Sequence, residues 1–511
     1  MPLNLLILID DQHRHDALGC AAEGIPPQRR TWLMSSGRPL VQTPNLDRLA
    51  ATGVRFTQAV ANLPVCVPSR HSFITGLYPH QLGILSNAHY WPGQPPVPTL
   101  GHRLQAAGYA TAAIGKMHWK SRWAPDDHVP DTRGFAFRAT RGGNTDGPCH
   151  ISYLETLTKE ERRLRAAWAE QFGVGGESRA GYVGDVAPVP GARLPEAWLA
   201  DQAVAYLQTY RQREGNRPFC LIVSLDRPHP PNVIPADYAG LYDPEAVPLP
   251  PPVPPGFHED DHHIRRQIAV RGWGEMDERE LRLSIARYLT NVTYVDHCLG
   301  RVLDALEEAG LADTTLVVFF SDHGEMLGER NRAHTKYCLY ESAVRVPLLL
   351  RWPGVSRPGL VSHAPVELVD LMPTWLEAAG LPVPDMLPGR SLRPLLAGQP
   401  PEALGWRTAT FSELYTAVDT PGAPRGQWAI RTSRYKLIER VAAMSALYDL
   451  EADPNEFDNR IDDPALAPVP EQLRLHLLRE VMRRAEQFPA RHEPVVAIAR
   501  PSPPATRQHG Q

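Results

Sequence analysis

The sequence lacks paired cysteines, any cluster of basic residues, any long apolar run and any internal repeat. Its six cysteines are scattered without paired spacing, so we expect no disulfide framework. The formal net charge of -4 gives no electrostatic footprint for nucleic acid or for an anionic membrane. We therefore expect a small soluble molecule as the partner, with no nucleic acid and no membrane involved.

The most apolar stretch near the start, LNLLILI at residues 3–9, meets Asp10 and Asp11 directly. It is too short for the core of a signal peptide with its flanks and for a membrane span. We interpret it as a buried strand and predict a cytoplasmic protein.

The chain has 511 residues, which is more than one ordinary core takes, so we expect a large domain and a smaller one. Alternating apolar strands and helices predict an α/β domain over residues 1–400, with a large, mostly parallel mixed sheet sandwiched by helices. Residues 401–487 contain TATFSELY, QWAIRTSRYKLIER and ALYDLEADPNEFDN, which predict a smaller α+β domain on an antiparallel sheet. Residues 488–511 are interpreted as a Pro-rich tail.

Two helices are clear in the pattern. TPNLDRLAATG predicts a helix with Thr43 as N-cap, Pro44 in the first turn and Gly53 just past the end. Apolar residues recur at three- and four-residue spacing over 280–309, which predicts a long amphipathic helix.

Residues capable of chemistry follow several predicted strands, and parallel sheets carry their sites at the carboxyl ends of strands. These residues are Asp10, Asp11, Lys116, His118, His229, Asp322 and His323. We expect them to lie together at one edge of the sheet.

The acidic residues occur in IDDQ at 9–12 and SDHGE at 321–325. Carboxylates released side by side from buried strands repel one another unless a cation lies between them, and hard oxygen ligands select calcium, magnesium or manganese. The alternative is that Asp10 or Asp322 only caps the following turn.

The basic residues need the same weighing, because most of the 20 histidines must be packing or surface residues. In GKMHW, Lys116 and His118 leave a strand two residues apart and are able to direct a cation and a base at one anion. His229 stands between prolines in RPHPP, and HTKY supplies Lys336. HEDDHH at 258–263 lacks ligand spacing, and we expect a solvated loop there.

Cys66 opens the stretch CVPSR, followed by HSFITG. Its three-residue gap to Arg70 does not fit a tyrosine-phosphatase loop, no papain-like signature surrounds it, and no second Cys is near enough for a zinc site. A buried structural Cys remains possible but does not account for Pro68 and Arg70.

CVPSR with TG at 75–76 resembles the signature of the sulfatases of the alkaline phosphatase superfamily, in which the Cys is oxidised to formylglycine. IDDQ, TPNLDRLAATGVRF, GKMHW, SDHGEMLGE, ESAVRVPLLLRWPG, LVDLMPTWLEAAG and LYDLEADPNEFDN are similar to sulfatase segments in the family's order, so the resemblance covers nearly the whole chain. It implies a formylglycine-generating enzyme as a maturation partner.

The resemblance also implies roles for the site residues. One divalent cation, calcium with manganese as the alternative, would be bound by Asp10, Asp11, Asp322, His323 and the modified Cys66. Arg70 and His118 would hold the formylglycine hydrate, with His118 as the base; Lys116 and Lys336 would bind the anionic group of the substrate, and His229 would protonate the leaving oxygen.

Hydrolysis of a sulfate ester through a covalent hemiacetal sulfate is the function that this resemblance implies. Many sulfatases carry Asn at the position of His323, whereas His there and RPHPP at 227–231 are similar to phosphonate monoester hydrolases. Phosphonate or phosphate ester hydrolysis, alone or beside sulfate ester hydrolysis, is therefore the second hypothesis. A noncatalytic binding protein with unconverted Cys66 is the third.

The sequence leaves the organic part of the substrate open between aryl, sugar and quaternary ammonium groups. We expect a homo-oligomer in which the tail packs on a neighbouring subunit.

Overall fold

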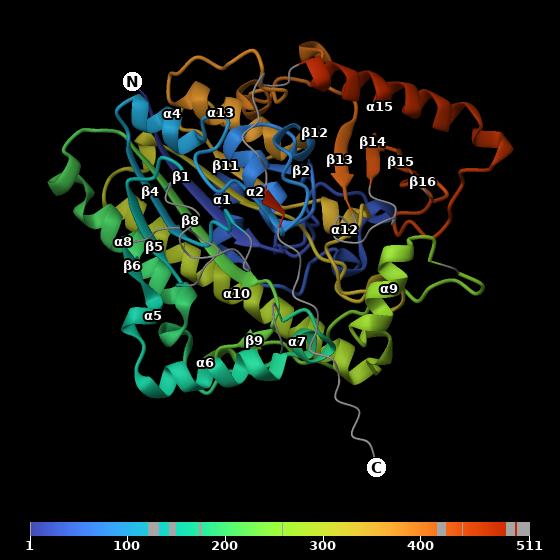
Figure 1. Ribbon diagram of the computed structural model, residues 1–511, viewed down its shortest axis with the longest axis horizontal. Helices are drawn as coiled ribbons and strands as arrows, with labels where there is room; N and C mark the ends of the chain where they lie inside the picture. The colour runs from blue at the N-terminus through green and yellow to red at the C-terminus, as the bar shows by residue number, and fades with distance from the viewer. Residues whose placement is uncertain are drawn as a thin grey trace.

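The computed structural model describes residues 2–120, 132–142, 150–172, 176–257, 259–415, 426–441 and 443–486, together with the backbone of 496–497. Figure 1 shows a large sheet with helices on both sides and a smaller sheet, built from the C-terminal part of the chain, beside it. None of the helices in these residues is long and apolar enough to cross a membrane.

The large sheet has nine strands. Their order is β12 (Leu360–Glu367), β2 (Val54–Val60), β11 (Leu348–Arg351), β10 (Thr315–Ser321), β1 (Asn4–Asp11), β8 (Phe219–Pro228), β4 (Ala110–Gly115), β5 (Phe137–Thr140) and β6 (Ile151–Ser152). Only β11 runs antiparallel to its neighbours, and all other pairs in this sheet are parallel. The predicted mostly parallel mixed sheet is confirmed.

Strand β1 divides the core, because successive side chains of a strand point to opposite faces. Leu5, Ile7 and Ile9 pack in one apolar cluster, and Leu6 and Leu8 pack in another. The first cluster includes α2 (Cys66–Thr75), α4 (Leu100–Ala106) and α13 (Leu371–Ala378), whereas the second includes α1 (Pro44–Thr52), α8 (Pro195–Glu214) and α10 (Glu278–Glu308). Figure 1 shows α4 and α13 on the opposite side of the sheet from α8 and α10.

Both predicted helices are present. The helix expected over 280–309 is α10, whose N-cap Asp277 accepts a hydrogen bond from the backbone N–H of Glu280. Helix α1 begins at Pro44 and ends at Thr52, as its pattern predicts. Thr43 is the N-cap residue, but its hydroxyl bonds to the Asp47 carboxylate 3.0 Å away and not to a backbone N–H of the first turn.

The C-terminal sheet is antiparallel, as predicted, with strands β13 (Thr410–Leu414), β14 (Gln427–Arg431), β15 (Tyr435–Arg440) and β16 (Ala446–Asp449). Helix α15 (Pro468–Glu486) packs on it through Leu473 and Leu477. The remaining helices and strands are short or peripheral: β3 (His89–Tyr90), β7 (Asp185–Val186), β9 (Val233–Ile234), β17 (Val496–Ala497), α3 (Pro79–Leu82), α5 (Tyr153–Thr156), α6 (Lys159–Phe172), α7 (Arg179–Val183), α9 (His262–Val270), α11 (Glu329–Arg332), α12 (Glu341–Val344) and α14 (Arg393–Leu396).

The acidic run before α9 is not the solvated loop that we expect from its composition. Asp261 is 3% exposed and caps α9 by accepting hydrogen bonds from the N–H groups of His263 and Ile264. Glu259 is buried and accepts a hydrogen bond from Arg330 Nε at 2.6 Å. These carboxylates are buried because a helix start and an arginine satisfy them; position 258 lies outside the described residues.

Candidate metal and catalytic site

Parallel pairing of β1 and β10 brings the two acidic sequences together. Asp10 lies beside Ser321 in the register of this pair, so Asp11 and Asp322 follow at the same edge of the sheet. Strand β2 leads to residue 66, the first residue of α2, at that edge. The predicted gathering of site residues at carboxyl ends of strands is therefore what the structure contains.

Four buried side chains form a ligand cluster. Asp11, Cys66, Asp322 and His323 each offer one ligand atom, and these atoms lie within 4.8 Å of one another. Cys66 Sγ is 3.2 Å from His323 Nε2 and 3.9 Å from Asp11 Oδ1. Two carboxylates, an imidazole and residue 66 around one point form a donor set that suits a divalent cation.

Asp10 lies next to this cluster but is not one of its four members. Its Oδ2 is 2.5 Å from His13 Nδ1, whereas its buried Oδ1 has no hydrogen-bond partner among the described residues. A buried carboxylate oxygen without a donor is unfavourable, and a cation would satisfy it. Asp10 thus fits the role of a further ligand.

The surroundings of the cluster shift the pKa values of its two carboxylates in opposite directions. Burial dominates for Asp322 and raises its pKa to about 6. Burial and the negative charge of Cys66 oppose ionisation of Asp11, but the positive charges of Lys116, His229 and Arg70 outweigh them and hold the pKa of Asp11 well below its usual range. Lys116 Nζ and Arg70 Nη2 lie 2.7 Å and 3.2 Å from Asp11 Oδ2.

His323 is oriented for ligation. Its Nδ1 lies 3.0 Å from the carbonyl oxygen of Gly324, which only accepts, so Nδ1 carries a proton and Nε2 faces the cluster. Burial lowers the pKa of His323, but the negative charges of Asp322 and Cys66 outweigh it and raise that pKa to about 9. A divalent cation would take the place of this proton on Nε2, so the residues fit the metal that the sequence predicts.

Cys66 lies where an anion is favoured. Its side chain is 1% exposed, and burial alone would raise its pKa. The positive charges of Lys336, His323 and Lys116 outweigh burial and lower that pKa well below the usual value, and a hydrogen bond from His118 acts in the same direction. This position therefore stabilises negative charge, whether on the residue or on a group bound to it.

Arg70 is used mainly to hold the ligands. Its Nε donates to Asp322 Oδ2 at 2.7 Å, and its Nη1 donates to the carbonyl of Lys116 at 2.7 Å and to Ser224 Oγ at 2.9 Å. With the bond to Asp11, four of the five donors of the guanidinium are engaged by the protein. Arg70 thus ties α2 to the ends of β1, β10, β4 and β8.

Lys116 and His118 follow β4 and line a cavity beside the ligand cluster. Lys116 Nζ also lies 3.6 Å from Asp226 Oδ1. His118 has a φ of 52°, a left-handed conformation that a non-glycine residue adopts at an energetic cost. Such local strain is typical of side chains held in place for function.

Lys336 and His229 form a pair. His229 Nδ1 lies 2.7 Å from the carbonyl oxygen of Pro230, so Nδ1 carries a proton, and Nε2 accepts a hydrogen bond from Lys336 Nζ at 2.7 Å. Burial and the charge of Lys336 lower the pKa of His229. Burial opposes the charge on Lys336, but Cys66 and Glu177 outweigh it and raise its pKa well above the usual value. At neutral pH the ammonium therefore holds the shared proton.

Sequence reasoning missed three residues that support this site. Glu177 Oε1 lies 3.2 Å from Lys336 Nζ, Gln12 Oε1 accepts from the same ammonium at 3.0 Å, and Asp226 contacts Lys116. Gln12 follows the two aspartates of β1, with a φ of 69°, and Asp226 precedes RPHPP, so their positions carried a signal. Glu177 lies in no recognisable motif.

A cavity of about 460 Å³ adjoins the site, which is large enough for a small organic molecule. Lys116, His118 and His229 line it together with residues of α6 and the start of α8. The site residues therefore face a space in which an ester can be bound.

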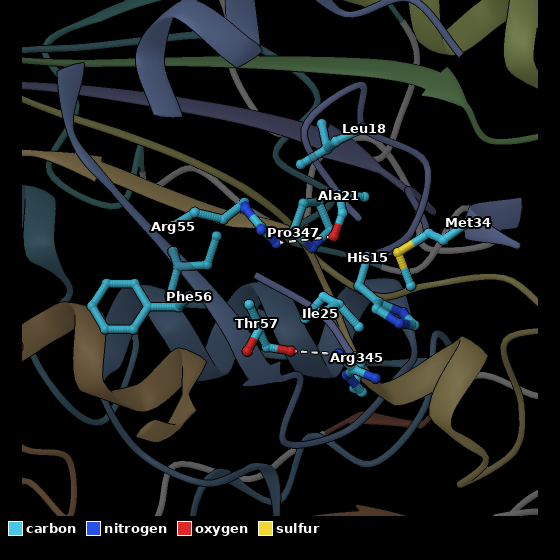
Figure 2. A pocket seen from close by; sticks show the side chains of 11 residues that line it. His15, Leu18, Ala21, Ile25, Met34, Arg55, Phe56, Thr57, Arg345 and Pro347 are labelled. Carbon is cyan, nitrogen blue, oxygen red and sulfur yellow. Dashed lines mark hydrogen bonds between the residues drawn. The ribbon is translucent and has the colours of Figure 1, made fainter. Parts of the chain in front are cut away.

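A second cavity, shown in Figure 2, is much smaller. It measures about 10 Å³ and is enclosed by β2, by residues 15–34 and by residues 345–348. Arg55 donates to the carbonyl of Ala21 at 3.3 Å, and Arg345 donates to the carbonyl of Thr57. The space is about that needed for one water molecule, so no ester fits there.

Comparison with known proteins agrees with the geometry. Residues 4–381 match the family model described as sulfatase, and residues 328–483 match the one described as N-sulphoglucosamine sulphohydrolase, C-terminal.

Individual relatives resemble the chain over most of its length. A choline-sulfatase from Rhizobium meliloti is 31% identical over 446 residues, 83% of this chain and 78% of the relative. The multifunctional alkaline phosphatase superfamily protein PehA from Trinickia caryophylli is 31% identical over 505 residues, 91% of this chain and 92% of the relative. The solved structure of a phosphonate monoester hydrolase from Silicibacter pomeroyi is similar with a TM-score of 0.74 and 27% identity, covering 97% of this chain and 99% of that one. The first of the two family matches begins at the first residue of β1 and runs past the end of β12, so it spans every strand of the large sheet, and the chain is a member of the sulfatase family.

Proposed function

We propose that this protein hydrolyses sulfate esters with Cys66, oxidised to formylglycine by a formylglycine-generating enzyme, as its nucleophile. The position of Cys66 carries the proposal. Its Sγ is one of the four ligand atoms of the cluster, the charges of Lys336 and Lys116 and a hydrogen bond from His118 act on it, and Lys116 and His118 line the cavity. A residue held in this way suits the role of a nucleophile that attacks an anionic group.

The divalent metal, held by Asp10, Asp11, Asp322, His323 and residue 66, would supply positive charge that makes a hydroxyl at residue 66 easier to ionise. A formyl group in place of the thiol adds water to give two hydroxyls on one carbon, one to attack sulfur and one to expel sulfate afterwards. The chain's own residues provide the rest of the chemistry.

Lys116 and Lys336 are placed to bind the sulfate oxygens and to stabilise their negative charge in the transition state. Both ammonium groups are buried beside Cys66, where electrostatic interactions are stronger than in water. His118, whose side chain lies within hydrogen-bonding reach of residue 66, is the proposed base that takes the proton from the second hydroxyl on an unprotonated ring nitrogen.

The Lys336–His229 pair is the proposed proton source for the leaving oxygen. The proton rests on Lys336 Nζ, 2.7 Å from His229 Nε2, and His229 lines the cavity that is proposed to hold the ester. Arg70 acts on the carboxylate ligands and on the backbone of Lys116.

Phosphonate or phosphate ester hydrolysis is the second candidate function. The similarity to the phosphonate monoester hydrolase of Silicibacter pomeroyi and the nitrogen ligand offered by His323 favour it. Tetrahedral sulfate and phosphate groups have similar shapes, and a nitrogen ligand makes manganese suitable beside calcium.

The test begins with mass spectrometry of the tryptic peptide of residues 56–70 from protein made beside a formylglycine-generating enzyme. We expect residue 66 to have lost its sulfur and gained an aldehyde oxygen. The converted protein should then hydrolyse an aryl sulfate, and rates on phosphonate and phosphate esters rank the second function. A Cys66→Ala variant should fold and be inactive. Persistence of the thiol, or full activity of Cys66→Ala, would contradict the proposal.

A further inference from the structure

The cavity of about 460 Å³ beside the site has both apolar and charged side chains in its wall. Helix α6 contributes Leu164, Arg165, Trp168 and Phe172, which recur at helical spacing on the face that lines the cavity. Leu164, Trp168 and Phe172 supply apolar surface, as do Leu157 before the helix and Val233 of β9. An apolar or aromatic body of a substrate fits against this surface.

The charged residues of the wall are mostly paired with each other. Glu161 accepts from Arg193, and Glu196 accepts from Arg227. These two pairs neutralise themselves and leave no net charge for a ligand.

Arg165 is different. It lies half-buried on the cavity wall and has no hydrogen bond or ion pair with any of the described residues. The charge that acts most strongly on Arg165 is that of Arg141, whose Nη1 already lies 3.2 Å from Asp226 Oδ1. The same carboxylate lies 3.6 Å from Lys116, which is paired more closely with Asp11, so Asp226 is already engaged by two cations other than Arg165.

The pKa of Arg165 also indicates that its positive charge is poorly compensated. Burial, and then the charge of Arg141, lower the pKa of Arg165, so both effects disfavour its charged form. An anion placed beside the guanidinium would remove this disadvantage and use its free donors. One further group is unsatisfied, because Asp226 Oδ2 is buried without a hydrogen-bond partner among the described residues and is able to accept from a hydroxyl.

We propose that the leaving alcohol of the substrate carries a second anionic group, such as a carboxylate or sulfate, on an apolar or aromatic body, and that Arg165 binds this group. The inference rests on the proposed function, since it assigns the part of the ester that occupies the cavity. The same excess of positive charge disfavours a quaternary ammonium leaving group, such as that of a choline ester.

Binding of two inert ligands tests the inference without any turnover. Neither 4-sulfobenzoate nor benzenesulfonate has an ester bond, and only the first carries a carboxylate. Isothermal titration calorimetry of the converted, metal-loaded protein should show 4-sulfobenzoate binding about tenfold more tightly at low salt, with the preference shrinking as salt rises. Equal affinities at low salt would overturn the inference.

Variants of α6 locate the effect. Arg165→Gln should remove the preference and Arg165→Lys should keep part of it, because lysine retains the charge without the planar donor fork. Arg163→Gln is the matched control, since Arg163 is exposed on the same helix, and it should keep the full preference. A preference that survives Arg165→Gln would also overturn the inference.

Hydrolysis separates the two proposals. With 4-sulfooxybenzoate and phenyl sulfate as substrates, we expect a lower KM for 4-sulfooxybenzoate in the protein that retains Arg165. The two KM values should be equal in Arg165→Gln. If both esters are hydrolysed equally well and bind equally, the function stands and the inference fails. If neither ester reacts while the preference of the calorimetric ligands persists, the inference about the cavity stands and the proposed function fails.

Discussion

Replacement of Glu177 by Gln tests the buried charge network behind the site. Glu177 is 15% exposed, and its two oxygens lie 3.2 Å from Lys336 Nζ and 3.0 Å from Arg271 Nη2. Burial would raise its pKa, but Lys336 and Arg271 outweigh burial and lower it from 4.5 to about 2. The difference corresponds to about 3 kcal/mol of folding stability at pH 7. Glu177→Gln keeps the shape of the side chain and removes this contribution.

The direction of the pKa shift determines how the contribution of Glu177 to folding stability changes with pH. Because the pKa of Glu177 is lower in the folded than in the unfolded protein, its contribution is present in full above pH 4.5 and is lost as pH falls towards 2. The deficit of Glu177→Gln in free energy of unfolding should therefore be about 3 kcal/mol at pH 7 and about half of that at pH 3. Urea denaturation followed by tryptophan fluorescence measures both values.

The matched control is Glu275→Gln. Glu275 pairs with Arg179 at 3.3 Å but is 78% exposed, so its loss should cost less than about 0.5 kcal/mol. We also expect kcat/KM of Glu177→Gln to fall about tenfold, because Lys336 loses the charge that positions it. The reasoning is refuted if Glu177→Gln is no less stable than Glu275→Gln at pH 7, or if its deficit does not change between pH 7 and pH 3.

Three other outcomes follow from the site. Arg70→Lys should lower kcat at least about 100-fold, because a lysine cannot span Asp322, Asp11 and the carbonyl of Lys116 at once; steady-state kinetics normalised to the fraction of residue 66 converted in each protein checks this, and a normalised rate near that of the parent would contradict it. Removal of divalent metal with EDTA should abolish turnover and lower the melting temperature, and calcium or manganese at about 100 times its Kd should restore about 2.7 kcal/mol of stability; a melting temperature insensitive to EDTA and metal would count against the ligand cluster. Lys336→Met should lower kcat more for an ester with a poor leaving group than for one with a good leaving group, since only the former needs the proton of the Lys336–His229 pair; equal losses on both esters would show that Lys336 serves only to bind the anion.

The sequence predicted the sheet and the ligand cluster for a definite physical reason. Apolar strands, once paired in parallel, bring their carboxyl ends to one edge, so Asp11 and Asp322 had to become neighbours. Cys66 was predicted because its surrounding residues matched a known pattern. The division of the chain at residue 400 and the roles of individual site residues stay predictions.

Other features depend on contacts that no local pattern encodes. Glu177 reaches Lys336 across the fold from the segment before α7. Glu259 and Asp261 were misjudged because composition alone does not reveal that Arg330 and the start of α9 would bury them. The proposed role of Arg165 could likewise not be predicted from sequence, because it rests on the absence of a hydrogen-bond or ion-pair partner among the described residues.

The burial of α2 bears on whether the proposed oxidation of residue 66 would come before or after folding. All ten of its residues are buried, including Pro68 and Arg70 beside Cys66, so an enzyme that must read this stretch has no access to it once the chain has folded. The proposed oxidation of residue 66 would therefore have to occur on the nascent or unfolded chain, in competition with the rate of folding. Under this proposal, a molecule that folds first would keep its thiol, and the active fraction of a preparation would be decided during synthesis.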